Sequence, residues 1–324
     1  MDPIERILID KDTTFVFMLE AQARGHELYY LHPADMFVRD AETHARMRRI
    51  EVARAEKHYN LYEERNAPLT WCDAVFMRKD PPFDLDFFFA THLLSLIDSR
   101  RTFVFNRPSG LREANEKLYA LRFPEVTPPT IVTADRSRLK AFLEEMGGEM
   151  IVKPLDGCGG SGVFHLTRGD RNLNSILETA TENGARLIMA QRYIPEVRQG
   201  DKRLIVLDGE PLGGVLRVPR EDESRGNIHV GGTVIRADVS ERDREICRIL
   251  APSLRADGLY FVGLDVIGGF LTEVNVTSPT GVQEINALDG VKLESKVINF
   301  VEDRVRKLRN EADRRSAGAR RQSS

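Results

Sequence analysis

Apolar positions in the first third of the chain repeat with alternating helical and strand-like periods. The segment TTFVFMLEAQARGH has helical spacing with Thr13 as its N-cap, ELYYLHP reads as a strand, and DAVFMRKDPP and RTFVFNRP read as short apolar strands closed by proline. These alternating elements predict a parallel sheet with helices on its faces. The intervening AETHARMRRIEVARAEKHYN is too charged for a core, so we expect an exposed, solvated segment rather than a ligand-binding one.

The remainder of the chain mixes helices with more closely spaced strands. SGLREANEKLYALRF predicts a helix that begins at Ser109 and stops before Pro124, and SRLKAFLEEMGG predicts one that ends at Gly147. Strands are expected at EMIVKPL, VFHL, RLIMAQRY, KRLIVLDG and EPLGGVLRVP, with a helix ending near Gly184 among them. SERDREICRILAPSLRADG predicts a helix with a capping box. The tail RNEADRRSAGARRQSS has almost no large apolar residue, so we expect it to be disordered.

Length and charge narrow the class of protein. A chain of 324 residues predicts more than one packing unit, since single cores stop growing near roughly 250 to 300 residues. Because 47 Lys and Arg nearly balance 50 Asp and Glu, the net charge of -3 gives no footprint for nucleic acid or a membrane surface. No apolar run reaches the ~18 residues of a membrane span, and MDPIERILID is unlike a signal peptide, so a cytoplasmic location is expected.

Three widely spaced cysteines, Cys72, Cys158 and Cys247, argue against a disulfide framework and a structural zinc site. We expect reduced thiols. Cys158 lies in a glycine-rich loop, where it is either a redox-sensitive thiol or a small, replaceable side chain.

That loop, in KPLDGCGGSGVF, places Lys153 ahead of Gly157, Gly159, Gly160 and Gly162. Glycines let successive backbone N–H groups turn toward one point, and such a concavity binds phosphate oxygens. The loop joins strand to strand, unlike the Walker and dinucleotide motifs, which open a helix. It therefore reads either as a phosphate-covering flap or as a mobile hairpin turn.

The hairpin LDVIGGFLTEVNVTSPTG carries three oxygen-bearing side chains where a buried strand would be apolar. Glu273 and Asn275, two residues apart, share a face, and Asp265 stands opposite Glu273 if the connecting loop holds an odd number of residues. The residues 268–270, Gly-Gly-Phe, provide such a loop. Two carboxylates and an amide oxygen suit Mg²⁺, and a bound cation relieves the conflict between adjacent carboxylates. The alternative is a hairpin with one polar face.

Several longer segments together resemble one known family. IVKPLDGCGGSGVF, AQRYIPEVRQGDKRLIVLDGEPLGGVLRVP, ESRGN with a downstream GG, and FVGLDVIGGFLTEVNVTSP are similar to bacterial glutathione synthetases, which are ATP-grasp ligases; MRKDPPFD and NEKL also match. The resemblance runs from Asp2 to about Arg304. It implies a mixed α/β and α+β architecture in which an ATP-grasp fold follows a Rossmann-like parallel-sheet N-terminal domain.

The implied domains are 1–116 for the N-terminal domain on the substrate side, 117–305 for the ATP-grasp domain and 306–324 for the disordered tail. The ATP-grasp domain has two expected lobes, about 117–190 and 191–305. Three departures from the family's pattern accompany this division. The family normally has an apolar strand before MDP, so the first strand is expected to be missing or its start misplaced. Gln283 stands where many relatives have Arg, and His229 and Val230 stand where small residues are usual.

The resemblance also assigns roles to individual residues. Lys117 and Lys153 are expected to contact ATP phosphates, and the loop with Gly157, Gly159 and Gly160 is expected to close over them. The expected adenine and ribose contacts are Gln191, Tyr193, Ile194 and Glu196.

Around the reacting groups, the resemblance places Arg203 near the transferred phosphoryl group and Arg225 in a lid. The expected magnesium ligands, which would also take manganese, are Asp265, Glu273 and Asn275. The expected contacts to the peptide substrate are Arg78, Ser278, Pro279 and Thr280. Without the resemblance, Arg203 reads as a surface ion pair with Asp201, Arg225 as a solvated loop charge, and Tyr193 and Ile194 as core packing.

The function implied by the resemblance is glutathione biosynthesis. ATP would phosphorylate the C-terminal carboxylate of γ-glutamylcysteine, and the amine of glycine would attack the acyl phosphate, releasing ADP and phosphate. No covalent nucleophile is needed. Partners would be these small molecules, with neither nucleic acid nor membrane, in a homotetramer or homodimer. Two alternatives are another ATP-grasp carboxylate-amine ligase and a noncatalytic ATP-binding regulator of the same fold.

Overall fold

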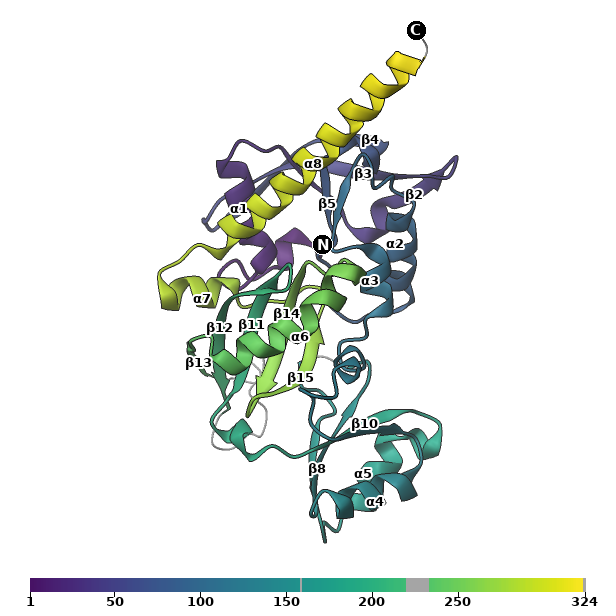
Figure 1. Cartoon of the computed structure of the whole chain (residues 1–324), viewed down its shortest axis with the longest axis vertical. Coiled ribbons are helices and arrows are strands. Elements are labelled where there is room, and N and C mark those ends of the chain that lie inside the picture. Colours follow the sequence, from purple (N-terminus) through teal and green to yellow (C-terminus); the bar gives the residue numbers. More distant parts are fainter. Residues whose placement is uncertain (158, 220–232, 323–324) are drawn as a thin grey trace. The chain divides into compact units, whose positions relative to one another are not determined.

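The structure, a computed structural model, describes residues 1–157, 159–219 and 233–322, and the side chains of the described residues up to 315 (Figure 1). The chain divides into two compact units. Unit 1 comprises residues 1–113, 253–262 and 276–324, and unit 2 comprises residues 114–252 and 263–275. The expected boundary at residue 116 lies close to the first division. The expected continuous second domain, however, differs from these units, because residues 253–262 and 276–305 pack with unit 1.

Unit 1 contains a parallel pair of strands and a separate antiparallel sheet. The parallel pair is β5 (Ala74–Phe76) and β6 (Phe103–Phe105). The antiparallel sheet has the order β1-β3-β2, with β4 also paired to β3: β1 (Leu28–Tyr30), β2 (Met36–Arg39), β3 (Glu42–Val52) and β4 (Tyr59–Pro68). The predicted parallel sheet is thus confirmed only for β5 and β6. The strand predicted at ELYYLHP forms β1 and pairs antiparallel with β3.

The charged segment was expected to be exposed, but it forms most of β3 and one of its faces is buried. Along β3 every second side chain from Thr43 to Met47 is buried, and Ile50 and Val52 are buried beyond a bulge. The arginines between them alternate to the other face. The apolar side chains are few, but they are spaced at the strand period of two. They therefore share one face of the strand, which can be buried while the charged side chains lie on the other face.

Two helices of unit 1 differ at their ends from the predicted ranges. Helix α1 (Thr13–Ala23) is capped by Asp12, whose side chain accepts a hydrogen bond from Phe15 N at 2.6 Å, so the predicted cap at Thr13 is wrong by one residue. The other helices of unit 1 are α2 (Leu85–Ser95), α3 (Pro108–Glu113), α7 (Val282–Asp289) and α8 (Leu293–Gln322). The helix predicted from Ser109 to Phe123 breaks after Glu113 and resumes only as a 3₁₀ turn, Tyr119–Arg122.

The tail expected to be disordered from residue 306 is helical as far as Gln322, as a continuation of α8. The first half of this helix packs against unit 1 through the buried side chains of Val297, Ile298 and Val301. Beyond them the sequence is rich in Arg, a strong helix former, and it contains no proline. The tail lacks apolar residues because it needs none to extend a helix that is already nucleated. None of the described helices is long and apolar enough to cross a membrane.

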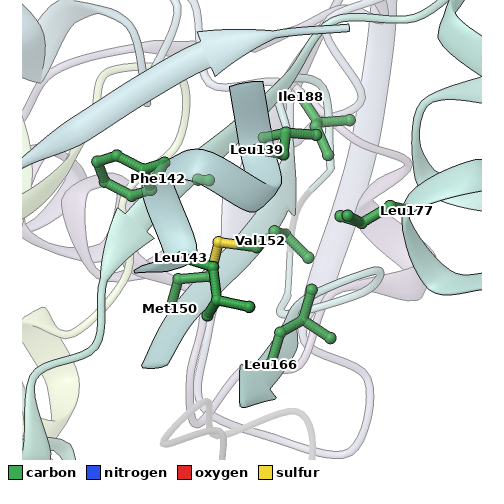
Figure 2. Packing of buried hydrophobic residues seen from close by; sticks show 9 residues of the cluster. Leu139, Phe142, Leu143, Met150, Val152, Leu166, Leu177 and Ile188 are labelled. Carbon is green, nitrogen blue, oxygen red and sulfur yellow. The ribbon is translucent and has the colours of Figure 1, made fainter. Parts of the chain in front are cut away.

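Unit 2 contains two antiparallel sheets. The first has the order β7-β10-β8-β9, formed by β7 (Thr130–Thr133), β10 (Ile188–Arg192), β8 (Glu149–Pro154) and β9 (Phe164–Thr167). Helices α4 (Arg136–Glu145) and α5 (Leu173–Ala180) pack on it. Figure 2 shows their shared core, in which Leu139, Phe142 and Leu143 of α4 meet side chains of the strands. The predictions of α4, β8, β9 and β10 are confirmed, whereas β7 was not predicted and α5 ends four residues before the expected Gly184.

The second sheet of unit 2 has the order β13-β12-β11-β14-β15. Its strands are β13 (Thr233–Arg236), β12 (Glu210–Val218), β11 (Asp201–Leu207), β14 (Phe261–Ile267) and β15 (Phe270–Asn275). Helix α6 (Glu241–Asp257) starts with the predicted capping box. Ser240 N donates to Asp243 Oδ2 at 2.8 Å, and Asp243 N donates to Ser240 Oγ at 3.2 Å.

Candidate active site

The β14–β15 hairpin places Asp265 directly opposite Glu273, as predicted. The predicted three-residue loop is wrong, because Ile267 pairs with Phe270 and only Gly268 and Gly269 form the turn. The odd residue is instead inserted further along, in a bulge after Asp265 that leaves Thr272 without a partner in the register. Both turn glycines have positive φ, 56° and 78°, which explains the Gly-Gly pair. The predicted pairing of the two carboxylates is therefore confirmed, although the odd residue lies in a bulge and not in the connecting loop.

Asn275 completes the polar face of the hairpin. It lies two residues beyond Glu273 on the same strand, and its amide Nδ2 is 3.3 Å from Asp265 Oδ2. Among the described residues no three His, Cys, Asp or Glu side chains gather as metal ligands. The oxygen set here contains only two carboxylates, with an amide as the third member. These are the hard oxygen donors that Mg²⁺ prefers, so the residues present fit such an ion.

Two arginines from the neighbouring strands hold Asp265. Arg203 donates from Nε to Oδ1 at 2.5 Å and from Nη2 to Oδ2 at 3.0 Å, and Arg217 Nη2 lies 3.1 Å from Oδ2. Burial alone would raise the pKa of Asp265, but the two guanidinium groups outweigh it and hold that pKa well below its usual value. Arg203 is only 8% exposed, so its alternative reading as a surface ion pair is wrong.

Arg217 was missed by sequence reasoning, although it lies at the centre of this network. Besides Asp265 it binds Asp201, which is itself buried. Burial raises the pKa of Asp201 to about 6, whereas the carboxylates of Asp201 and Asp265 outweigh burial at Arg217 and raise the pKa of its guanidinium. The available signal was a lone arginine in the apolar strand segment GGVLRVP, at a position where a buried charge requires a partner.

Two lysines contact the β14–β15 hairpin. Lys153 lies on β8, in the first sheet of unit 2, and Lys117 lies just before the 3₁₀ turn Tyr119–Arg122. Lys117 Nζ lies 3.0 Å from Glu273 Oε1 and donates to Gly157 O at 2.6 Å. Lys153 Nζ donates to Thr272 O at 3.2 Å, and burial lowers the pKa of this ammonium group. The structure thus brings both expected phosphate lysines to the hairpin, and it brings Lys117 to the glycine loop as well.

The glycine loop follows β8, as the sequence predicted. Gly159, Gly160 and Gly162 have φ values of 64°, 82° and 71°, which side chains rarely adopt. A Cβ at Gly157 would lie 2.7 Å from Cγ of Pro154, so a side chain does not fit there either. Cys158 lies outside the described residues, as do Arg225, His229 and Val230 of the expected lid. Cys72 and Cys247 are free thiols.

The end of β10 and the segment that follows it carry the residues expected to hold adenine. Gln191 is buried and donates from Nε2 to Thr130 Oγ1 at 3.0 Å, and Ile194 is buried as well. The Tyr193 ring stacks on His165, with centroids 4.0 Å apart and planes 15° apart. A Cβ at Gly268 would lie 3.2 Å from Glu196 Oε2, so Glu196 reaches the hairpin turn. His165 was not singled out from the sequence.

The expected peptide-site residues all lie in unit 1. Arg78 is buried, donates from Nη2 to Pro279 O at 3.0 Å and from Nε to Thr14 Oγ1 at 3.1 Å, and thereby fixes the segment that contains Ser278 and Thr280. Burial lowers the pKa of Arg78 to about 10. Gln283, which stands where many relatives have Arg, donates to Asp12 O at 2.6 Å and so anchors the start of α1.

Comparison with known proteins agrees with this geometry. The model of the prokaryotic glutathione synthetase ATP-grasp domain matches residues 116–290, and that of the prokaryotic glutathione synthetase N-terminal domain matches residues 1–112. The chain belongs to the prokaryotic glutathione synthetase family. The predicted family is therefore confirmed, and with it an ATP-dependent ligase that makes glutathione.

Curated relatives extend the match over nearly the whole chain. The glutathione synthetase of Gloeobacter violaceus is 47% identical over 307 residues, covering 93% of this chain and 94% of the relative. Those of Coxiella burnetii and Salmonella typhimurium are 47% and 46% identical, covering 93% and 95% of this chain and 94% and 98% of the relatives.

Solved structures support the ATP-grasp fold. The ATP-grasp ligase PsnB complexed with minimal precursor has a TM-score of 0.60 at 16% identity, over 90% of this chain and 95% of that one. A RimK domain protein from Sphaerobacter thermophilus has a TM-score of 0.57 at 17% identity, over 91% and 96%. At these identities the likeness concerns the fold alone.

Proposed function

We propose that unit 2 activates the C-terminal carboxylate of γ-glutamylcysteine with ATP and that glycine then displaces phosphate from the acyl phosphate. The observation that supports this proposal is the convergence of four cationic side chains on one hairpin. Lys117, Lys153, Arg203 and Arg217 each contact β14 or β15. A group of cations gathered on one hairpin suits the phosphate oxygens of a nucleotide.

Asp265, Glu273 and Asn275 would hold the metal, Mg²⁺ or Mn²⁺, since their oxygens share one face of the hairpin. When bound, the ion neutralises phosphate charge and orients the terminal phosphoryl group. The same carboxylates pair with Lys117 and Arg203, so the cations that would face the phosphate oxygens lie beside the proposed metal ligands.

The other residues position the substrates. Tyr193 and Ile194 offer an aromatic and an aliphatic surface for adenine, and Gln191 and Glu196 offer hydrogen-bonding groups beside them. The glycine loop would cover the phosphates with backbone N–H groups. Arg78 and the segment Ser278–Thr280 would bind the peptide carboxylate in unit 1, and Arg225 would close the lid that excludes water from the acyl phosphate. The active form is proposed to be a homotetramer or homodimer.

Phosphate release tests this function against its alternatives. The chain is incubated with ATP and Mg²⁺, with γ-glutamylcysteine and glycine present together or singly, and products are identified by mass spectrometry. Formation of one glutathione per phosphate supports the proposal. Phosphate release with other dipeptides or amines only would favour another ATP-grasp ligase, and nucleotide binding without turnover of any peptide would favour a regulator.

A further inference from the structure

The side chain of Gln283 is fixed in the first turn of α7, where many relatives have Arg. Gln283 is only 8% exposed. Its amide Nε2 donates to Ile9 O at 2.9 Å and to Asp12 O at 2.6 Å, so both donors of the amide are used within unit 1. These two bonds set the orientation of the amide and leave its oxygen as an acceptor for another group.

That acceptor holds Arg54, a residue between β3 and β4 that is distant from α7 in the sequence. Arg54 Nη2 donates to Gln283 Oε1 at 2.6 Å, and both residues belong to unit 1. A guanidinium group has no acceptor, so an arginine at position 283 could not receive this bond and would place two like charges in contact. Arg54 and Gln283 therefore form a matched pair, in which the positive charge usual at position 283 stands on the neighbouring side chain.

The charge of Arg54 is only weakly compensated. Its ion-pair partner is Asp10, with Nη1 and Oδ1 3.6 Å apart, and the two side chains are 50% and 88% exposed. A long pair at this exposure contributes little. The guanidinium Cζ also lies 5.8 Å from the centroid of the Phe15 ring. Among the described residues, the hydrogen bond to Gln283 is the one that the five donors of this guanidinium make, so donors remain for an anion.

The contacts of Gln283 lead to the expected peptide site. Gln283 holds the carbonyl of Asp12 at the start of α1, and two residues further along Thr14 accepts a hydrogen bond from Arg78 Nε. Arg78 also donates to Pro279 O, four residues before Gln283. The guanidinium group beside Gln283 and that of Arg78 thus flank the same short segment at the start of α1.

The proposed substrate carries a carboxylate at each end. In γ-glutamylcysteine the C-terminal carboxylate is the one that would become the acyl phosphate, whereas the α-carboxylate of the glutamyl end stays unchanged throughout the reaction. Arg78 is buried and held by Thr14 and Pro279, but Arg54 is half exposed and can direct donors toward a ligand. The planar fork of a guanidinium group matches a carboxylate with two parallel hydrogen bonds.

We propose that Arg54 is a specificity-determining residue that binds the α-carboxylate of the γ-glutamyl end of the substrate, in place of the arginine usual at position 283. Gln283 is the positioning residue, because its amide oxygen fixes the guanidinium group. The inference rests on the proposed function for the identity of the substrate. Since this carboxylate does not react, Arg54 should contribute equally to binding of the substrate and of the transition state.

Three variants and two substrates test the proposal. The variants are Arg54→Gln, the double variant Arg54→Gln with Gln283→Arg, and the control Arg39→Gln, whose side chain on β2 is 77% exposed. The substrates are γ-glutamylcysteine and γ-aminobutyrylcysteine, which differ only in the glutamyl α-carboxylate. Phosphate release gives kcat and KM, and calorimetry with Mg²⁺ and a nonhydrolysable ATP analogue gives Kd. The melting temperature of each variant checks its folding.

Arg54→Gln should raise both KM and Kd for γ-glutamylcysteine by about tenfold or more while changing kcat only a few-fold. It should leave both constants for γ-aminobutyrylcysteine unchanged, since that substrate has no carboxylate for Arg54 to bind. The double variant should recover most of the loss, because it returns a guanidinium group to the other side of the same contact. Arg39→Gln should change none of these constants, and the melting temperature should stay the same in Arg54→Gln.

Equal losses with both substrates would reduce Arg54 to a structural role and overturn the proposal, as would an unchanged KM for γ-glutamylcysteine. A double variant no better than Arg54→Gln would overturn the exchange of charge between positions 54 and 283. The proposed function fails separately: γ-glutamylcysteine that binds in an Arg54-dependent way, with no glutathione formed by the unmodified chain, would contradict the ligase reaction and still support this carboxylate contact.

Discussion

Asp265 stands directly opposite Glu273 across a hairpin whose two-residue turn would, in a regular ladder, set these side chains out of register. The bulge that leaves Thr272 unpaired restores the alignment, and the Thr272 hydroxyl donates to Asp265 O at 3.1 Å within it. A β-bulge beside a site re-aims a side chain at the expense of ladder regularity. Here it aligns two carboxylates that the cations of unit 2 then surround.

Replacing Arg203 tests its role beside the reacting phosphoryl group. Arg203 donates two hydrogen bonds to Asp265, beside the expected position of the transferred phosphoryl group. A nucleotide should therefore still bind without Arg203, whereas charge developing during transfer would lose a donor. Arg203→Ala should lower kcat by about 100-fold or more and change the KM for ATP only a few-fold. Steady-state kinetics measures both. Arg244→Ala, at an exposed position on α6, is the matched control. An unchanged kcat would remove the proposed role.

Arg217 should matter for stability as well as for the site. Its loss leaves Asp201 and Asp265 buried with one cation fewer, so Arg217→Met should lower the free energy of unfolding by about 3 to 5 kcal/mol in urea titration. Adding Asp201→Asn removes one of the buried charges and should restore part of the loss. If the double variant is no more stable than Arg217→Met, Asp201 is not the charge that Arg217 compensates.

The metal assignment predicts a specific change in magnesium dependence. Glu273→Gln keeps the shape of the side chain but removes a charged oxygen donor, so the Mg²⁺ concentration for half-maximal turnover should rise by about tenfold or more. Glu245→Gln on the exposed face of α6 should leave it unchanged. The same Mg²⁺ dependence in Glu273→Gln and the unmodified chain would argue against Glu273 as a ligand.

Cys72 should react slowly with alkylating agents near neutral pH. Burial raises the pKa of its thiol to about 11, so the reactive thiolate is scarce at pH 8 and should increase about tenfold with each pH unit up to pH 10. Mass spectrometry of peptides labelled with iodoacetamide gives the rate at this residue. Activity should survive labelling of Cys72, because the proposed reaction uses no thiol. Fast labelling at pH 7 would contradict the predicted protection.

Strand periodicity carried most of what the sequence could predict about this site. The alternation of Glu273 and Asn275 and their pairing with Asp265 follow from a period of two, so these residues were found without knowledge of the fold. The bulge at Thr272 left no mark on the pattern. Arg217 was missed for a related reason: its partners Asp201 and Asp265 lie on two other strands, and only the sheet order brings them together.

Elsewhere the sequence misled where composition and spacing disagreed. The charge of the β3 segment suggested a solvated stretch, but Ala45, Met47 and Ile50 were sufficient to bury one face. The tail was expected to be disordered because it has too few apolar residues to form a core. Its residues nevertheless continue α8, because extending an existing helix depends on helix propensity and requires no core. The division into units could not be predicted either, because residues 253–262 and 276 onward return to unit 1 after long excursions in sequence.

Oxygen transfer from substrate to phosphate tests the central claim most directly. If ATP phosphorylates the C-terminal carboxylate of γ-glutamylcysteine, one carboxylate oxygen must leave with phosphate when glycine attacks the carbonyl carbon. With that carboxylate labelled with ¹⁸O, mass spectrometry should find one labelled oxygen in each phosphate released and one retained in the new peptide bond. Phosphate that is released without ¹⁸O while glutathione forms, or ATP hydrolysis without glutathione, would contradict the account.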